Sequence, residues 1–63
     1  MNTKKYHVVL SPEGSSRLKG FCADMHINFF RTEYGNKRYC EVIVTPDQFE
    51  MVENFLSTLE EAN

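Results

Sequence analysis

Residues 25–44 read MHINFFRTEYGNKRYCEVIV, and this segment decides the fold because it predicts a β-hairpin. Gly35-Asn36 is a strong two-residue turn signal, and it lies between two runs rich in β-branched and aromatic residues. With these two residues as the loop, Tyr34 pairs with Lys37, and the residue numbers of every cross-strand pair sum to 71. The pattern of apolar side chains provides a check on this register.

The register divides the hairpin into two unlike faces, because side chains alternate along a strand. Phe29 is aligned with Val42, Ile27 with Val44, and Arg31 lies opposite Cys40. One face is almost purely apolar, which is typical of a surface that packs against a helix. It consists of Met25, Ile27, Phe29, Cys40, Val42 and Val44. The other face is mixed and consists of His26, Asn28, Phe30, Thr32, Tyr39, Glu41 and Ile43.

The segment after the hairpin predicts an amphipathic helix of about four turns. Thr45 supplies an N-cap hydroxyl, Pro46 occupies the first helical position, and Gln48 completes a capping box. An apolar stripe follows at helical spacing, formed by Phe49, Val52, Leu56 and Leu59, with Met51 and Phe55 widening it. We expect this stripe to pack on the apolar face of the hairpin, chiefly against Met25, Ile27, Phe29, Val42 and Val44.

The first third of the chain is less clear. Residues 6–10 predict a short strand, and residues 11–16, with one Pro and one Gly, predict a turn. Residues 17–23 are ambiguous, since Leu18 and Phe21 are spaced for one helical turn, whereas Leu18 to Cys22 could also begin a long second strand kinked at Gly20. We favour the strand. The expected fold is one α+β domain over residues 1–63, a three-stranded antiparallel β-meander with one C-terminal helix on one face, in the order β-β-β-α.

Size and cysteine content point to self-association. A chain of 63 residues buries only about 60 % of its unfolded surface, and two cysteines cannot form the disulfide framework of a small secreted domain. Such domains commonly gain stability by pairing with a second copy, so we expect a homodimer. The apolar tract after Lys4 and Lys5 is far shorter than a signal-peptide core or a membrane span. We therefore expect a cytoplasmic protein without a membrane partner.

The net charge of −2 conceals an uneven distribution. Residues 1–45 hold all seven basic residues and four acidic ones, a net +3, whereas residues 46–63 hold five acidic and no basic residues, a net −5. The balance excludes a generally basic nucleic-acid binder. A solvated helix face accounts for the acidic end in the simplest way, but Glu50 and Glu53 could also meet a basic groove on a partner.

A single helix leaves the mixed face of the hairpin uncovered. Phe30 lies opposite Glu41 and diagonal to Tyr39 and Ile43, so these apolar groups form a contiguous patch. Contiguous exposed apolar surface usually marks an interface. We expect a small regulatory, inhibitor-like protein that binds a second copy or a larger protein target. The expected binding residues are Phe30, Tyr39, Ile43, Arg31, Arg38, Glu50 and Glu53.

A second reading is a nucleic-acid or nucleotide-binding module. Aromatic side chains on a sheet face, with Arg31 and Arg38 near them, resemble the ingredients of a platform that stacks bases and holds phosphates. The mild overall charge and the acidic helix oppose this reading. Binding that weakens steeply with salt would favour nucleic acid, whereas indifference to salt would favour a protein partner.

Catalytic and metal-binding chemistry is not indicated. Cys22 and His26 form the only closely spaced Cys-His pair, and the register puts Cys40 on the core face while His26 faces the other way. The same geometry argues against a Cys-His nucleophile. The carboxylates of the terminal helix lack an apolar pocket that would raise a pKa. We expect no enzymatic activity, no metal and no cofactor.

Overall fold

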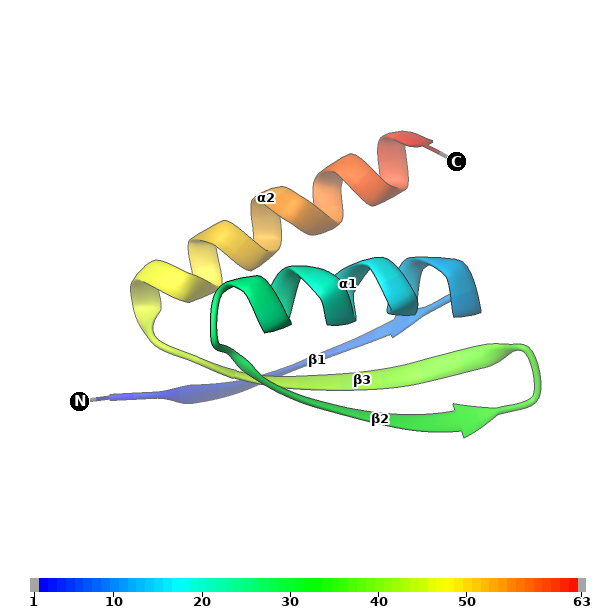
Figure 1. Ribbon diagram of the computed structural model, residues 1–63, viewed down its shortest axis with the longest axis horizontal. Helices are drawn as coiled ribbons and strands as arrows, with labels where there is room; N and C mark the ends of the chain where they lie inside the picture. Colours follow the sequence, from blue (N-terminus) through cyan, green and yellow to red (C-terminus); the bar gives the residue numbers. More distant parts are fainter. Residues whose placement is uncertain (1, 63) are drawn as a thin grey trace.

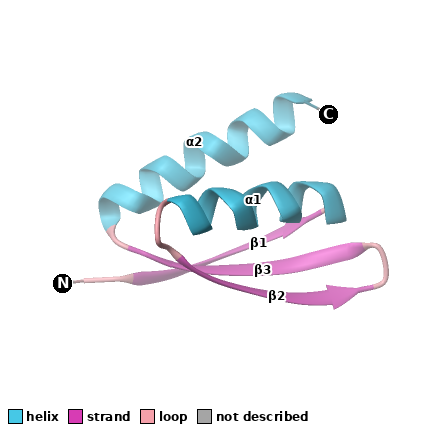
Figure 2. Ribbon diagram, in the orientation of Figure 1, coloured by secondary structure: helices cyan, strands magenta, loops and turns pink. Residues whose placement is uncertain are grey.

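The computed structural model describes residues 2–62, with side chains to residue 59. The elements are β1 (Lys4–Leu10), α1 (Pro12–Asp24), β2 (Asn28–Tyr34), β3 (Lys37–Val44) and α2 (Pro46–Ala62). The three strands form one antiparallel sheet in the order β1-β3-β2. Both helices lie on the same face of this sheet, with α1 across its middle (Figure 1), and the other face carries no helix (Figure 2).

The predicted β-β-β-α meander is wrong, because residues 12–24 form a helix and the last strand lies in the middle of the sheet. The chain runs from β1 through α1 to β2 at the far edge, and β3 then returns between them. β1 and β2 are therefore parallel to each other and separated by β3. The fold remains α+β, with two helices instead of one.

α1 is a helix because it has a good start and a buried face. Ser11 is the N-cap, and its Oγ accepts a hydrogen bond of 3.1 Å from the backbone N–H of Gly14. Pro12 fits the first turn, where its missing N–H costs nothing. Ser15, Leu18 and Cys22 are fully buried at helical spacing. This packing outweighs the weak helix propensity of the two glycines.

α1 ends in a Schellman motif, which explains why residues 25–27 are not part of a strand. The N–H of Ile27 donates to the carbonyl of Cys22 at 2.8 Å, and that of His26 to Ala23 at 3.3 Å. His26 adopts a φ of 57°, the left-handed conformation that usually belongs to glycine at this position. The long second strand predicted to begin near Leu18 is therefore wrong, and β2 starts only at Asn28.

The predicted hairpin register is confirmed. Phe29 pairs with Val42, Arg31 with Cys40 and Tyr34 with Lys37, and Gly35 in the loop has a φ of 59°. The pairing of Ile27 with Val44 lies outside the ladder, which begins at Asn28.

The capped C-terminal helix is also confirmed. The Thr45 N–H donates to Gln48 Oε1 at 3.0 Å, and the Gln48 N–H donates to Thr45 Oγ1 at 3.3 Å, which completes the capping box. The predicted packing residues Ile27, Val42, Val44, Val52, Leu56 and Leu59 are buried, and Met25, Phe29 and Phe49 are packed against them. Leu18 and Cys22 of α1 and Cys40 of β3 complete this core. Within residues 2–62 neither helix is long and apolar enough to span a bilayer.

Candidate functional site

The sheet face opposite the helices is left uncovered by both helices (Figure 2). In the observed register its side chains come from alternate positions of all three strands. We call this surface the open aromatic face. It comprises Lys5, His7 and Val9 of β1, Asn28, Phe30, Thr32 and Tyr34 of β2, and Lys37, Tyr39, Glu41 and Ile43 of β3.

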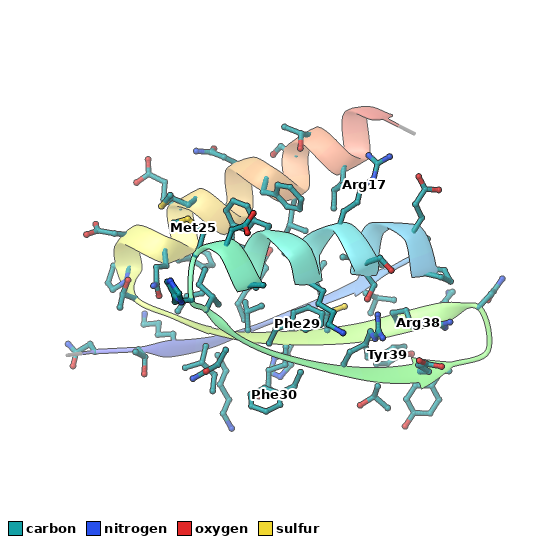
Figure 3. The ribbon with its side chains drawn as sticks, in the orientation of Figure 1. Arg17, Met25, Phe29, Phe30, Arg38 and Tyr39 are labelled. Atoms are coloured by element: carbon teal, nitrogen blue, oxygen red, sulfur yellow. The ribbon has the colours of Figure 1, made fainter. Side chains whose placement is uncertain are left out.

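The open aromatic face exposes a group of aromatic and apolar side chains, which lies toward the hairpin end of the sheet. Exposed fractions are 55 % for Phe30, 50 % for Tyr39, 52 % for Val9 and 61 % for Tyr34. The rings of Tyr34 and Tyr39 lie with centroids 4.9 Å apart, and Tyr39 is flanked by Val9 on the neighbouring strand. Figure 3 shows Phe30 pointing away from the helices, whereas Phe29 points toward them.

Polar groups lie beside these aromatic and apolar side chains. His7 Nε2 and Glu41 Oε1 lie 2.8 Å apart, and Glu41 is half-buried opposite Phe30. Lys5 and Lys37 stand at opposite ends of the face. A shallow depression of about 270 Å³ lies between them and is lined partly by His7 and Phe30.

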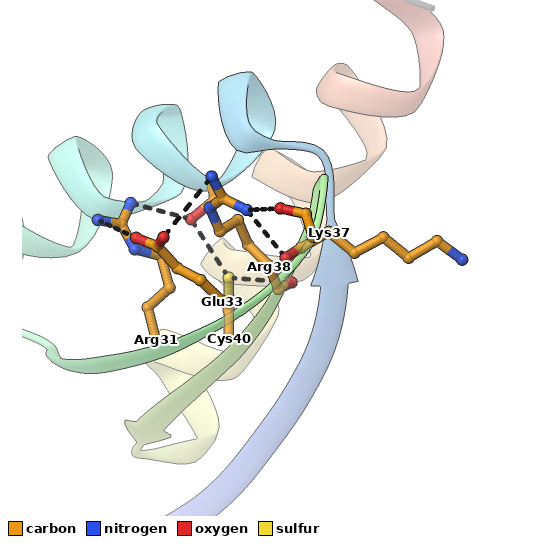
Figure 4. A network of polar contacts seen from close by, with 7 residues as sticks. Arg31, Glu33, Lys37, Arg38 and Cys40 are labelled. Carbon is orange, nitrogen blue, oxygen red and sulfur yellow. Dashed lines mark hydrogen bonds and ion pairs between the residues drawn. The ribbon is translucent and has the colours of Figure 1, made fainter.

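Arg31 and Arg38, predicted as binding residues, lie on the helix side of the sheet and not on the open aromatic face. Arg31 Nη1 donates to Ser15 Oγ of α1 at 3.3 Å. Arg38 Nη1 donates to the carbonyls of Gly35 and Lys37, each at 3.0 Å. Glu33 lies between the two guanidinium groups, 4.0 Å from Arg31 and 3.9 Å from Arg38 (Figure 4). The arginines therefore brace the β2–β3 end of the sheet.

The remaining predicted site residues are split between two surfaces. Phe30, Tyr39 and Ile43 share the open aromatic face, with Ile43 half-buried. Glu50 and Glu53 are exposed on α2, on the helix side of the molecule. The structure thus brings three of the seven predicted residues together.

Sequence reasoning missed the contribution of β1 to this face. Val9, His7 and Lys5 join it because β1 pairs directly with β3. The sequence of β1 does not alternate cleanly, because Val8, Val9 and Leu10 are all apolar, and the strand order that places β1 beside β3 was predicted incorrectly. Tyr34 was also missed, although the confirmed register puts it on the same face as Phe30.

The two thiols lie inside the core, as predicted for Cys40. Both cysteines are unpaired and buried, and Cys40 Sγ lies 3.5 Å from Ser15 Oγ. Burial, with a smaller contribution from Cys40, raises the pKa of Cys22 from 9.0 to about 11. In the described residues no group of three or more His, Cys, Asp or Glu side chains is placed to hold a metal ion.

Comparison of the chain with models of protein families, with curated proteins and with solved structures finds no match in any of the three.

Proposed function

We propose that this chain is a small regulatory binding protein whose open aromatic face docks on the surface of a larger protein. The observation that carries the proposal is the cluster of Phe30, Tyr34, Tyr39 and Val9, each at least half exposed, on one side of a sheet. Aromatic residues are enriched in the centres of protein interfaces, and contiguous apolar patches on small proteins usually mark such interfaces.

The chemistry of the face defines the partner. Lys5 and Lys37 stand at the two ends of the open aromatic face, while its one carboxylate, Glu41, already has His7 as a partner. A complementary surface is therefore apolar where it meets the exposed aromatic side chains and carries carboxylates where it meets the two lysines. The half-buried Glu41 disfavours a phosphate backbone at the same place. Arg31 and Arg38 lie on the helix side of the sheet, away from the aromatic side chains, and this position weighs against nucleic-acid binding.

Three further parts of the proposal follow from the cysteines and from the length of the chain. Cys22 does not act as a nucleophile, since a buried thiol whose pKa is raised to about 11 supplies little thiolate at neutral pH. The chain works in a reducing compartment such as the cytoplasm, which suits two unpaired cysteines. It also works as a homodimer, because a 63-residue domain gains stability from pairing.

Site-directed photo-cross-linking tests the proposal. A photoreactive amino acid at Thr32, exposed on the open aromatic face, should capture a protein in the native host, whereas the same group at exposed Glu50 of α2 should not. The captured protein is then purified and its affinity for the chain measured. Capture only from position 50 contradicts the proposal.

The affinity measurement needs a matched variant. Tyr39→Ala should raise the Kd about tenfold or more, in the range of an interface hot spot. Met51→Ala removes an exposed apolar side chain from α2 and should leave the Kd unchanged. Capture of nucleic acid from position 32, with an affinity that falls steeply as salt rises, would overturn protein binding in favour of the nucleic-acid reading.

A further inference from the structure

The outer edge of β1 is the less protected edge of the sheet. The strand order leaves β1 and β2 as the two edges, and among residues 2–62 β1 pairs only with β3. β2 carries Arg31 and Glu33 on its helix side, and charges of this kind discourage edge pairing. β1 carries its two charges, Lys4 and Lys5, at its first two positions and has none from Tyr6 to Leu10. Such an edge is a template for another strand.

A groove of about 470 Å³ lies along the same strand. It is lined by Tyr6, Val8 and Leu10 of β1 and, across from them, by Leu56 of α2. An added strand would lie about 4.8 Å outside β1. Its helix-side side chains would then continue the row formed by Tyr6, Val8 and Leu10 beside this groove.

We propose that β1 pairs in antiparallel orientation with β1 of a second copy, so that the two three-stranded sheets become one six-stranded sheet. The inference rests on the homodimer of the proposed function and names the surface that forms it. An antiparallel pair of identical strands has the two-fold symmetry that a closed dimer requires. The dimer also removes the exposed β1 edge from both copies and places their two open aromatic faces on one continuous sheet.

The alternation of side chains fixes the register of this pairing. Directly opposed residues point to the same face, so even-numbered residues must oppose even-numbered ones. The register centred on His7 pairs all seven residues of each β1. Tyr6 then opposes the partner's Val8 on the helix side, and Lys5 opposes the partner's Val9 on the open aromatic face. A register centred on Val8 would leave Lys4 and Lys5 without partners, and one centred on Tyr6 would oppose Lys5 to the partner's His7.

Charge complementarity identifies the occupant of this edge as a second copy. In the register centred on His7, the partner's Lys4 opposes Leu10, and both point to the helix side. Glu53 lines the same groove as Leu10 and makes no ion pair within the described side chains. Glu13 also lines the groove, but Arg17 already pairs with it at 3.1 Å. The two-fold axis therefore places a lysine on the side of the sheet that carries the unpaired carboxylate of Glu53, at both ends of the interface. No two lysines oppose each other.

Disulfide cross-linking tests the register. His7 lies on the two-fold axis, and opposed Cβ atoms are about 4.5–5.5 Å apart, so His7→Cys should form an intermolecular disulfide under mild oxidation. In Lys5→Cys the partner's substituted residue lies about 13 Å away along the strand, so this control should not cross-link. Lys5→Cys with Val9→Cys should cross-link again. The native thiols are buried. Equal cross-linking of His7→Cys and Lys5→Cys, or none of His7→Cys, overturns the register.

A charge exchange tests the same contact in solution. Val9→Lys places a lysine opposite the partner's Lys5 twice in each dimer, and Val9 is 52 % exposed, so the chain should still fold. By sedimentation equilibrium the dimer Kd should rise about tenfold or more. Adding Lys5→Glu to the same chain turns both contacts into opposite-charge pairs and should restore the Kd to within about threefold of the original. A monomeric wild-type chain at high micromolar concentration, or an unchanged Kd in Val9→Lys, overturns the proposal.

A third variant separates this inference from partner binding. Phe30→Ser with Tyr39→Ser removes two exposed rings that lie outside β1, so it should abolish binding of the larger protein and leave the dimer Kd unchanged. If no larger protein is found, the dimer Kd still tests the β1 pairing. If this variant is monomeric, the copies pack through their open aromatic faces, and the β1 pairing is wrong.

Discussion

Gly20 is a glycine that the backbone does not require. It lies in the interior of α1 on its exposed side, and a Cβ added there would meet nothing within 4 Å outside its own helix. Glycine costs a helix interior about 0.5–1 kcal/mol relative to alanine. Gly20→Ala should therefore raise the free energy of unfolding by about that amount, measured by urea denaturation.

Gly35 provides the contrasting control for this measurement. Its φ of +59° is left-handed, so Gly35→Ala should destabilise the hairpin by about 1 kcal/mol. If Gly20→Ala destabilises the chain instead, the helical assignment of residues 12–24 is contradicted.

Cys22 couples the stability of the core to alkaline pH. Its pKa is about 11 in the folded chain, raised mainly by burial, against 9.0 when unperturbed. The unfolded thiol therefore loses its proton first, and the unfolded state is increasingly favoured between pH 9 and 11. The free energy of unfolding should fall by roughly 2–3 kcal/mol across this window from this group. The contribution is fully present below pH 9.

The Cys22→Ala variant isolates this effect from the other groups that titrate in the window. It should be less stable at neutral pH because of the cavity it leaves. Its stability should nevertheless decline less between pH 9 and 11 than that of the original chain. If the free energy of unfolding falls with the same slope between pH 9 and 11 in both chains, the pKa of Cys22 is the same in the folded and unfolded states.

The placement of Arg31 could be read from the sequence, although its role was predicted incorrectly. The confirmed register opposes it to Cys40, on the core face. Its grouping with the exposed aromatic residues relied on closeness in the chain, which says nothing about the face of a strand. Its hydrogen bond to Ser15 could not be predicted without knowing that residues 12–24 form a helix.

At the scale of elements, the two helices begin with the same signal. Ser11-Pro12 and Thr45-Pro46 each place a hydroxyl before a proline, and both hydroxyls accept a backbone N–H three residues later. α2 was predicted because Gln48 completes its capping box and a long apolar stripe follows. In α1 the equivalent position is Gly14, and a second glycine follows, so the same start resembled a turn. The tertiary contacts of Leu18 and Cys22 decide the helix.

Removing these caps should weaken both helices. Ser11→Ala and Thr45→Ala each delete one hydrogen-bond acceptor at a helix N-terminus, and each should lower the free energy of unfolding by about 1 kcal/mol. Thr58→Ala is the matched control, since its hydroxyl only donates to the Phe55 carbonyl within α2, and its effect should stay within about 0.5 kcal/mol. If Ser11→Ala behaves like the control, Ser11 does not cap α1.

At the scale of the whole molecule, local patterns predicted the hairpin and the last helix but not the order of strands. Helix α1, which was not predicted, carries the chain from β1 to the far edge of the sheet. This connection leaves room for β3 between β1 and β2. Without that helix a meander is the simplest connection. In a meander β2 would be the central strand, and β3 would be an edge strand. The exposed β1 edge and the contribution of Val9 to the open aromatic face are consequences of this order.

Dimerisation through β1 should make thermal stability depend on protein concentration. A ligand that binds only the folded chain stabilises it by mass action, and a second copy acts as such a ligand. Above the dimer Kd, each tenfold rise in concentration should raise the Tm by about 3 °C or more for a domain of this size. Differential scanning calorimetry over a hundredfold range measures the trend. Val9→Lys should flatten this rise in Tm, because it opposes the new lysine to the partner's Lys5. Adding Lys5→Glu to the same chain should restore the rise, because the opposed charges are then unlike. A Tm that rises equally in all three chains would place the dimer contact elsewhere on the molecule.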